Sequence, residues 1–212
     1  MIKVNEIYYS IQGESSNAGL PCIFIRLTYC NLRCAYCDTE YAFYEGKDYS
    51  IEEIISEIKK YNCNLLEITG GEPLVQEGAY ELMQQLCDTG YEVMLETGGS
   101  LPIETVDRRV KIIMDLKCPS SKMVLKNRYE NIMFLKPKDE VKFVIGNRED
   151  YEWTKGIIRE YSLKDRCHIL ISPVFGAIQP AELVEWILDD NLKVRFQLQL
   201  HKFIWEPGKK GV

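Results

Sequence analysis

Apolar runs alternate with amphipathic segments along this chain, and this alternation is the strongest constraint on its fold. Each run is bounded by turn residues and has the length of a strand; the runs lie at 22–29, 64–71, 91–99, 110–117, 141–147, 168–173 and 193–200. Helical patterns between them predict helices over 50–61, 78–90, 149–161 and 181–190. The first helix starts with a capping box of Ser50 and Glu53, and the last follows Pro180.

A strand followed by a helix and a further strand is typical of a parallel sheet with crossover helices. Six or seven such strands can form an open doubly wound sheet or an arc of a β/α barrel, and both place ligands at the carboxyl ends of the strands. The stretches that follow the strands are TYCNLRCAYC, TGGEP, ETGG, DLKCPSSK and SPV. We expect them to gather at one rim of the sheet.

Length and composition predict one domain over residues 1–212. A chain of 212 residues that is 46% hydrophobic can bury a core of its own. Its formal net charge of -6 argues against a nucleic-acid partner, because such surfaces are made of clustered lysines and arginines. The first residues show no signal-peptide pattern, and no apolar run approaches the roughly 20 residues of a membrane span. We therefore expect a cytoplasmic protein that does not bind membranes.

Three of the eight cysteines lie within the stretch CNLRCAYC, at Cys30, Cys34 and Cys37. The other five are scattered, which is typical of small buried side chains rather than of a disulfide framework. A structural zinc site normally has four protein ligands, and no fourth cysteine or histidine follows at a suitable spacing. An iron-sulfur cube held by three cysteines would keep one iron open for chemistry.

The C-x3-C-x2-C spacing, with Tyr36 before the last cysteine, resembles the radical S-adenosylmethionine (SAM) superfamily. TGGEP at 69–73 resembles the superfamily's GGE motif, in which glycine allows a ligand to approach the backbone. The resemblance implies a partial, truncated parallel β/α barrel, a 4Fe-4S cluster on the three cysteines, and SAM on the open iron. An electron from the cluster would then cleave SAM to a 5'-deoxyadenosyl radical.

Further stretches resemble the family of 7-carboxy-7-deazaguanine synthases. They are IQGE at 11–14, FIRL around Arg26, CDT at 37–39, PSSK at 119–122 and QLHKFIW near the C-terminus. This family implies a carbon-nitrogen lyase of deazapurine (queuosine) biosynthesis. It converts 6-carboxy-5,6,7,8-tetrahydropterin to 7-carboxy-7-deazaguanine with loss of ammonia, assisted by Mg²⁺.

The resemblance also implies roles for individual residues. Substrate-binding residues would be Gln12, Gly13, Glu14, Arg26, Thr69 and His201, and Thr39 would bind Mg²⁺. SAM-binding residues would be Tyr36, Asp38, Gly71, Glu72, Glu96, Thr97, Ser120, Lys122 and Ser172. No protein acid or base is assigned, because the radical forms on SAM. A short tail, about 202–212, would lie near the substrate pocket, where Pro207 or the carboxylate of Val212 could meet the pterin.

Arg26 lies on an apolar strand, and a buried guanidinium needs an anion. The substrate carboxylate is one candidate, and an internal salt bridge with Glu67 or Glu96 is the alternative. For Gln12, Glu14 and Thr39, the alternative to ligand binding is an ordinary turn or cap.

Few residues are available to cover the sheet between Cys37 and Ser50 or between Lys117 and Lys138. We therefore expect a thin helical ring whose open flank is closed by substrate or by a partner. The family resemblance implies a homodimer and an electron donor such as flavodoxin or ferredoxin. Two other classes stay open: an activase of glycyl-radical enzymes, and a non-catalytic iron-sulfur or zinc protein.

Overall fold

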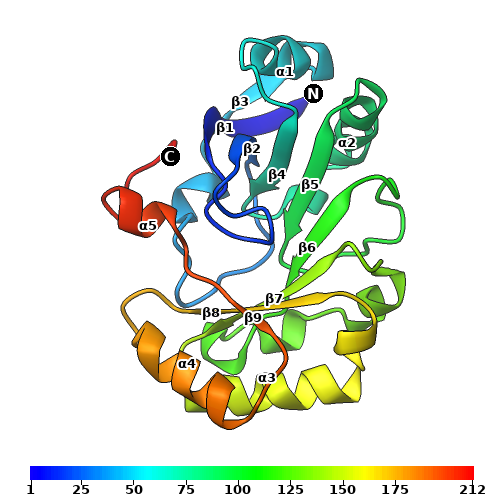
Figure 1. Cartoon of the computed structure of the whole chain (residues 1–212). Helices are drawn as coiled ribbons and strands as arrows, with labels where there is room; N and C mark the ends of the chain where they lie inside the picture. Colours follow the sequence, from blue (N-terminus) through cyan, green and yellow to red (C-terminus); the bar gives the residue numbers. More distant parts are fainter.

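The computed structural model describes residues 1–212 and contains one curved, nine-stranded sheet with helices on its outer side (Figure 1). The strands are β1 (Ile2–Ile11), β2 (Pro21–Leu27), β3 (Lys47–Tyr49), β4 (Leu65–Gly70), β5 (Glu92–Thr97), β6 (Lys111–Asp115), β7 (Glu140–Ile145), β8 (His168–Pro173) and β9 (Arg195–Phe196). The helices are α1 (Ile51–Ile58), α2 (Gly78–Asp88), α3 (Arg148–Glu160), α4 (Pro180–Asp189) and α5 (His201–Ile204). No helix is long and apolar enough to cross a membrane.

The strand order is β3-β1-β2-β4-β5-β6-β7-β8-β9. Strands β2 and β4 to β9 pair in parallel, whereas β1 pairs antiparallel with β2 and β3. The two edge strands, β3 and β9, do not pair with each other, so the sheet is an open arc. The predicted partial parallel β/α barrel is confirmed.

Two predicted features differ from the structure. At one edge, strands β1 and β3 are additions to the predicted strands. Polar Asn5 and Glu6 and a bulge between Val4 and Glu6 interrupt the apolar pattern of β1, and β3 is only three residues long. At the other edge, the strand expected over 193–200 is reduced to β9, and the chain then leaves the sheet. The segment 197–212 returns to the first strands, and Leu200 N donates to Gly13 O over 2.9 Å.

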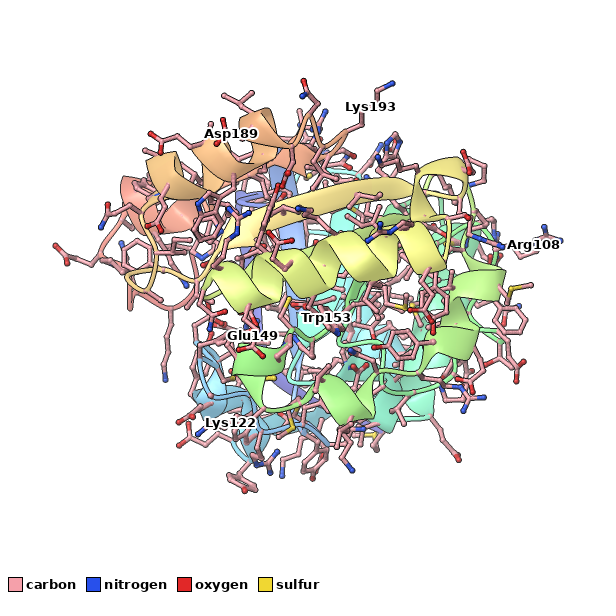
Figure 2. The ribbon with its side chains drawn as sticks, turned by 90° about the horizontal axis from the view of Figure 1, so that it is seen from below. Arg108, Lys122, Glu149, Trp153, Asp189 and Lys193 are labelled. Carbon is pink, nitrogen blue, oxygen red and sulfur yellow. The ribbon has the colours of Figure 1, made fainter.

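The helices begin where the sequence predicts. The side chain of Ser50 accepts a hydrogen bond from Glu53 N, and Glu53 returns one to Ser50 N, which completes the capping box. Ile54 and Ile58 of α1 are fully buried against the sheet. Figure 2 shows α3 and α4 on the outer side of the last strands, with Trp153 of α3 among the packed side chains.

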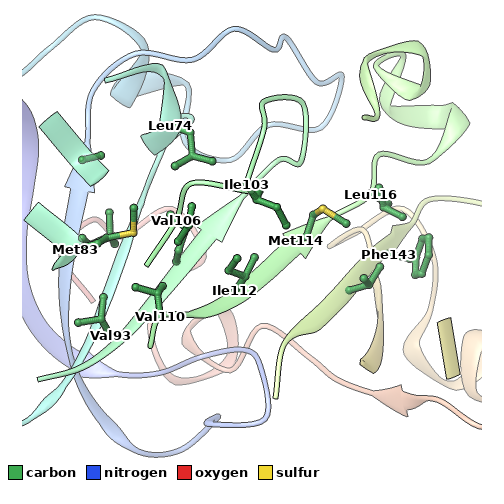
Figure 3. Packing of buried hydrophobic residues seen from close by; sticks show 14 of the residues in the cluster. Leu74, Met83, Val93, Ile103, Val106, Val110, Ile112, Met114, Leu116 and Phe143 are labelled. Atoms are coloured by element: carbon green, nitrogen blue, oxygen red, sulfur yellow. The ribbon is translucent and has the colours of Figure 1, made fainter. Parts of the chain in front are cut away.

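No helix connects β5 to β6, and loop residues take its place in the core. Ile103, Val106 and Val110 are buried and pack with Ile112 and Met114 of β6 in the main hydrophobic cluster (Figure 3). Short 3-10 turns occupy the connection between β6 and β7. The ring is therefore thin between β6 and β7, as predicted for residues 117–138, and also between β5 and β6, where no gap was predicted.

Successive side chains of a strand point to opposite faces of the sheet. The outer face is apolar, and the inner face carries both apolar and charged side chains. The inner side chains form a small separate cluster of Cys22, Phe24, Met94 and Ile113. The next inward positions on the same strands are Arg26, Glu96 and Asp115. The barrel interior thus has an apolar patch below a layer of charged side chains at the carboxyl ends of these strands.

Candidate active site inside the partial barrel

The inner face of the sheet surrounds a cavity of about 600 Å³. Most of the predicted site residues line it: Gln12, Gly13, Glu14, Arg26, Cys30, Cys34, Tyr36, Cys37, Asp38, Thr39, Thr69, Gly71, Glu96, Thr97 and His201. The tail contributes residues 207–212, which include Pro207 and Val212. One cavity therefore collects residues from both ends of the chain and from the loops after several strands.

Four predicted site residues do not line this cavity: Glu72, Ser120, Lys122 and Ser172. Ser120 donates to the Asp150 carboxylate, and Ser172 is buried in β8. Lys122 is exposed and has a left-handed backbone, with φ of 62°. Lys122 (labelled in Figure 2) lies next to the cysteine loop, because Ala35 N donates to the neighbouring Ser121 O over 3.0 Å.

The three cysteines of the predicted triplet lie in the loop after β2, where local hydrogen bonds fix their backbone. Leu32 N donates to Cys30 Sγ over 3.3 Å, and Cys37 N donates to Cys34 O over 3.2 Å. All three thiols are free and half-buried. Burial raises the pKa of the Cys30 and Cys34 thiols, while the nearby Lys117 ammonium opposes that rise.

These residues fit an iron-sulfur cluster with SAM beside it. No three metal-ligating side chains converge on a single-ion position; a cubane does not require this, because each thiolate binds a different iron. Next to the thiols, Asp115 Oδ1 is buried and has no hydrogen-bond partner in the protein. A buried carboxylate oxygen without a partner is costly, so a ligand with a donor group suits this position.

The TGGEP turn brings backbone close to the cysteine loop. Gly70 has a φ of 152°, and a Cβ at Gly71 would lie 2.3 Å from Tyr29 O. Glu72 stabilises the turn on the side that faces away from the cavity. Its carboxylate accepts hydrogen bonds from Thr97 Oγ1 over 2.9 Å and from Gly98 N over 2.8 Å. Glu72 therefore joins the turns after β4 and β5 instead of facing the cavity.

Gln12 and Glu14 enter the cavity from its opposite end, in the loop 12–20 between β1 and β2. Gln12 Nε2 donates to Glu67 Oε2 over 2.5 Å, and Gln199 Nε2 donates to Glu14 Oε1 over 2.9 Å. Burial and the neighbouring carboxylates of Glu96 and Glu14 raise the pKa of Glu67 well above its usual value. The hydrogen bond from Gln12 is the one polar contact from the loop 12–20 that opposes this rise.

Arg26 has an internal partner that differs from both expected ones. Its Nε donates to Glu6 Oε1 over 2.8 Å, and its Nη2 donates to Tyr8 Oη over 3.0 Å. Tyr41 also donates to Glu6 Oε1, over 2.9 Å. Arg26 Nη1 has no hydrogen-bond partner in the protein and belongs to a cavity-lining side chain. The guanidinium can therefore still bind an anion.

His201 and Gly13 are in close contact. A Cβ at Gly13 would lie 2.4 Å from His201 Nδ1, so only glycine leaves room for the imidazole there. Burial lowers the pKa of His201, so the ring is neutral at pH 7. The tail is also tied to the cysteine side, because Lys202 Nζ lies 2.7 Å from Asp38 Oδ2.

Charged residues that the sequence patterns did not identify also line the cavity: Glu67, Asp115, Lys117 and Lys142. Lys117 pairs with Asp115 over 2.9 Å, and Lys142 contacts acids of three elements. The sequence did contain a signal for such residues. A charged residue inside a buried parallel strand must face a partner or a ligand, and it could have been taken as a site candidate for that reason.

Comparison with known proteins identifies the family. Residues 24–176 match the radical SAM superfamily. The 7-carboxy-7-deazaguanine synthase of Chlorobaculum tepidum is 45% identical over 214 residues, which span all of this chain and 97% of that protein. The synthase of Clostridium acetobutylicum is 39% identical and aligns over 99% of both chains.

Solved structures share the fold. The crystal structure of QueE from Escherichia coli superposes with a TM-score of 0.78 at 22% identity and covers 94% of each chain. SuiB of Streptococcus suis, solved with S-adenosylmethionine bound, has a TM-score of 0.56 at 12% identity over 80% of this chain and 44% of that one. The chain therefore belongs to the radical SAM superfamily and, within it, to the 7-carboxy-7-deazaguanine synthases, lyases that use a 4Fe-4S cluster and SAM.

Proposed function

We propose that this chain converts 6-carboxy-5,6,7,8-tetrahydropterin to 7-carboxy-7-deazaguanine and ammonia, a step of deazapurine (queuosine) biosynthesis. The observation that carries this proposal is the single cavity. It joins the cysteine loop and the glycine turn at one end to Gln12, Glu14 and His201 at the other. Membership of the synthase family supports the same reaction.

Cys30, Cys34 and Cys37 would hold the cluster, which with SAM supplies the 5'-deoxyadenosyl radical that removes a hydrogen atom from C6 of the pterin. The hydrogen bond from Leu32 N to Cys30 Sγ stabilises the thiolate form of that ligand. The proposed SAM contacts that line the cavity are Tyr36, Asp38, Gly71, Glu96 and Thr97. Asp115 and Lys117, which also line it, extend this group.

The opposite end suits a flat heterocycle with a polar edge. Tyr8, Phe24 and Ile113 offer an apolar wall, and Tyr8 stacks on Phe24 with ring centroids 4.9 Å apart. Gln12, Glu14, Thr69 and neutral His201 provide donors and acceptors around that wall. Buried polar groups of a ligand need such partners, because each unpaired one costs binding free energy.

Arg26 Nη1 would bind the substrate carboxylate. Glu6 and Tyr8 already fix two of its nitrogens, so the guanidinium is oriented before the substrate arrives. Thr39 would supply a protein oxygen to Mg²⁺ near that carboxylate, since this ion keeps several waters and shares substrate oxygens. Thr39 Oγ1 lies 3.8 Å from Cys37 Sγ, next to the cluster loop.

A flavodoxin or ferredoxin as electron donor and a homodimer as the assembled state are also proposed, on the family resemblance. Cluster reduction by each purified carrier tests the first, and sedimentation of the reconstituted protein tests the second. A monomer at micromolar concentration would reject the dimer.

The reaction is tested on the reconstituted protein with dithionite and SAM, with and without the carboxypterin. We expect 5'-deoxyadenosine and 7-carboxy-7-deazaguanine only when the pterin is present. Formation of equal amounts of 5'-deoxyadenosine with and without the pterin would indicate another radical SAM substrate, such as the protein partner of an activase. The absence of 5'-deoxyadenosine under all conditions would favour a non-catalytic metal protein.

A further inference from the structure

We propose that Lys142 is a positioning residue that holds Glu14 and Glu96, from opposite walls of the cavity, as hydrogen-bond acceptors for the donor edge of the pterin. The inference rests on the proposed function and adds a residue to it that no family motif assigned. Lys142 lies in the middle of β7, where Val141 and Phe143 pack outward in the main core. Its own side chain therefore points into the barrel.

Three acids from three separate elements meet at the Lys142 ammonium. Nζ lies 3.0 Å from Glu14 Oε2, in the loop 12–20, and closer still to Glu96 Oε1 of β5. Asp115 Oδ2 of β6 is 3.8 Å away and is mainly paired with Lys117. An ammonium has three donors and no acceptor, so Lys142 can join these acids without competing for their other lone pairs.

The two carboxylates are fixed at both oxygens and keep free acceptor capacity. Glu14 accepts from Lys142 on Oε2 and from Gln199 on Oε1. Glu96 accepts from Lys142 on Oε1 and from Thr69 on Oε2, the latter over 3.0 Å. Because a carboxylate oxygen has two lone pairs, each of these four oxygens can accept one more hydrogen bond.

The charges explain why a cation is needed at this position. Lys142 is 5% exposed; burial opposes its charge, but Glu14, Glu96 and Asp115 overcome this and raise its pKa well above the usual value. Burial also opposes ionisation of Glu96, and Lys142 reverses the effect and lowers the pKa of Glu96. Without the ammonium, burial would raise the pKa of Glu96, as it raises that of Glu67.

The local charge also matches the substrate. Three acids, Glu14, Glu96 and Asp115, pair with two ammonium groups, Lys142 and Lys117. The cluster keeps one net negative charge. The amino group and ring N–H groups of a pterin are donors, and acceptors on a charged group make the stronger hydrogen bonds.

The test compares Lys142→Met with Lys142→Arg and with a matched control, Lys155→Met. Lys155 is a helix lysine outside the cavity that pairs with Glu152 and Asp190. Removing one partner of a buried, hydrogen-bonded charge pair predicts an increase of about thirtyfold or more in the KM for the carboxypterin with Lys142→Met. We expect a smaller increase in this KM with Lys142→Arg and no change in it with Lys155→Met.

Two readouts separate positioning from loss of structure. Cluster absorbance and the circular-dichroism spectrum of the Lys142→Met variant should match those of the parent protein, and its SAM affinity should fall less than its pterin affinity, since Glu96 is also a proposed SAM contact. In the double variant Lys142→Met with Glu96→Gln, the KM should rise by less than the product of the two single effects, because Lys142 acts partly through Glu96 and partly through Glu14. This double variant removes both charges of one pair, so it also serves if Lys142→Met alone does not fold.

An unchanged pterin KM in folded, cluster-loaded Lys142→Met would overturn the inference. So would a double variant whose KM is the product of the two single effects. Failure of the parent protein to turn over the carboxypterin would reject the proposed function instead, and that control is run first.

Discussion

The two ends of the cavity hold their groups by different means. At the carboxyl ends of the strands, which we term the rim, residues 28–39 and 69–72 fold next to each other through backbone contacts, such as the hydrogen bond from Glu72 N to Tyr29 O over 2.8 Å. At the amino ends, which we term the floor, the loop 12–20 depends on distant charges. Glu140 accepts from Ser16 N over 3.0 Å and pairs with Lys111 over 2.7 Å.

This difference follows from what each end has to bind. A cluster and its cosubstrate need thiols and open backbone, which a short loop with glycines provides. A polar heterocycle needs several donors and acceptors in fixed directions, and ion pairs between strands supply the rigidity. Changes at the rim should therefore affect cluster and SAM, and changes at the floor should affect the pterin.

The largest effect is expected for Cys34→Ala at the rim. Loss of one thiolate leaves the cluster with too few protein ligands, so we expect loss of the visible cluster absorbance and of all turnover. Cys87→Ala, a half-buried cysteine of α2, is the matched control and should retain both. Turnover by Cys34→Ala would remove this residue from the site.

Gly71→Ala should have the next largest effect, on SAM alone. The new Cβ would lie 2.3 Å from Tyr29 O and 2.7 Å from Cys30 Cβ, so the turn and the cysteine loop must move apart. A displacement of about 1 Å costs about a hundredfold in a reaction of oriented groups. We expect the KM for SAM to rise by about that factor, while equilibrium binding of the pterin is retained. Gly156→Ala in α3, where a Cβ meets no atom within 4 Å and the backbone is helical, separates the clash from a simple loss of glycine.

At the floor, Glu140→Gln should weaken pterin binding without affecting the cluster. Glu140 is fully buried, and the amide keeps an acceptor for Ser16 N but leaves Lys111 without its ion pair. Breaking a buried pair predicts a loss of about 3 kcal/mol in the free energy of unfolding, measured with urea. We expect the pterin KM to rise about tenfold. Glu152→Gln, at an exposed helix pair, should change neither quantity.

The residues of the rim were largely predictable because those that act together lie close together in the sequence. Cys30, Cys34 and Cys37 and the TGGEP turn lie within short stretches directly after strands whose apolar runs are continuous. Continuous apolar runs are typical of parallel strands that are buried on both faces. The sequence therefore indicated that the carboxyl ends of these strands lie at the same edge of the sheet. Glu72 shows the limit: its motif was found, but its side chain turns away from the cavity to bind Gly98 N.

The floor was only partly predictable, because its contacts join residues far apart in sequence. Gln12 and Glu14 were found only through a family motif. The same limit applies to Arg26, near the carboxyl end of β2, which was expected to pair with Glu67 or Glu96. Its actual partner, Glu6, lies on β1, whose irregular pattern hid the strand. A charge in a buried strand, such as Lys142, indicates that a partner exists, but the curvature of the sheet decides which one.

Thr39→Ala should give a smaller effect that concerns magnesium only. Loss of one neutral oxygen ligand is worth about 1 kcal/mol, so we expect the Mg²⁺ concentration for half-maximal rate to rise about fivefold. Cluster absorbance and SAM cleavage should be retained. The exposed Thr105→Ala gives the control, and an unchanged magnesium response would exclude Thr39 as a ligand.

The smallest effect is expected where the rim and the tail meet, at the pair of Asp38 and Lys202. Burial opposes ionisation of Asp38, but Lys202 outweighs it and lowers the carboxyl pKa from 3.8 to about 2. A lowered pKa stabilises the folded tail above pH 3.8, and this contribution is lost as the pH falls through about 2. The Asp38 side chain is 48% exposed, so solvent screens the pair, and its removal should have little effect on global stability. We expect Lys202→Met to raise the pterin KM by about twofold to fivefold at pH 7 and to speed proteolytic cleavage of residues 202–212. Lys193→Met, which takes part in no ion pair, is the control. A pterin KM equal to that of the parent protein would mean that Gln199 and the hydrogen bond from Leu200 N to Gly13 O hold the tail without this pair.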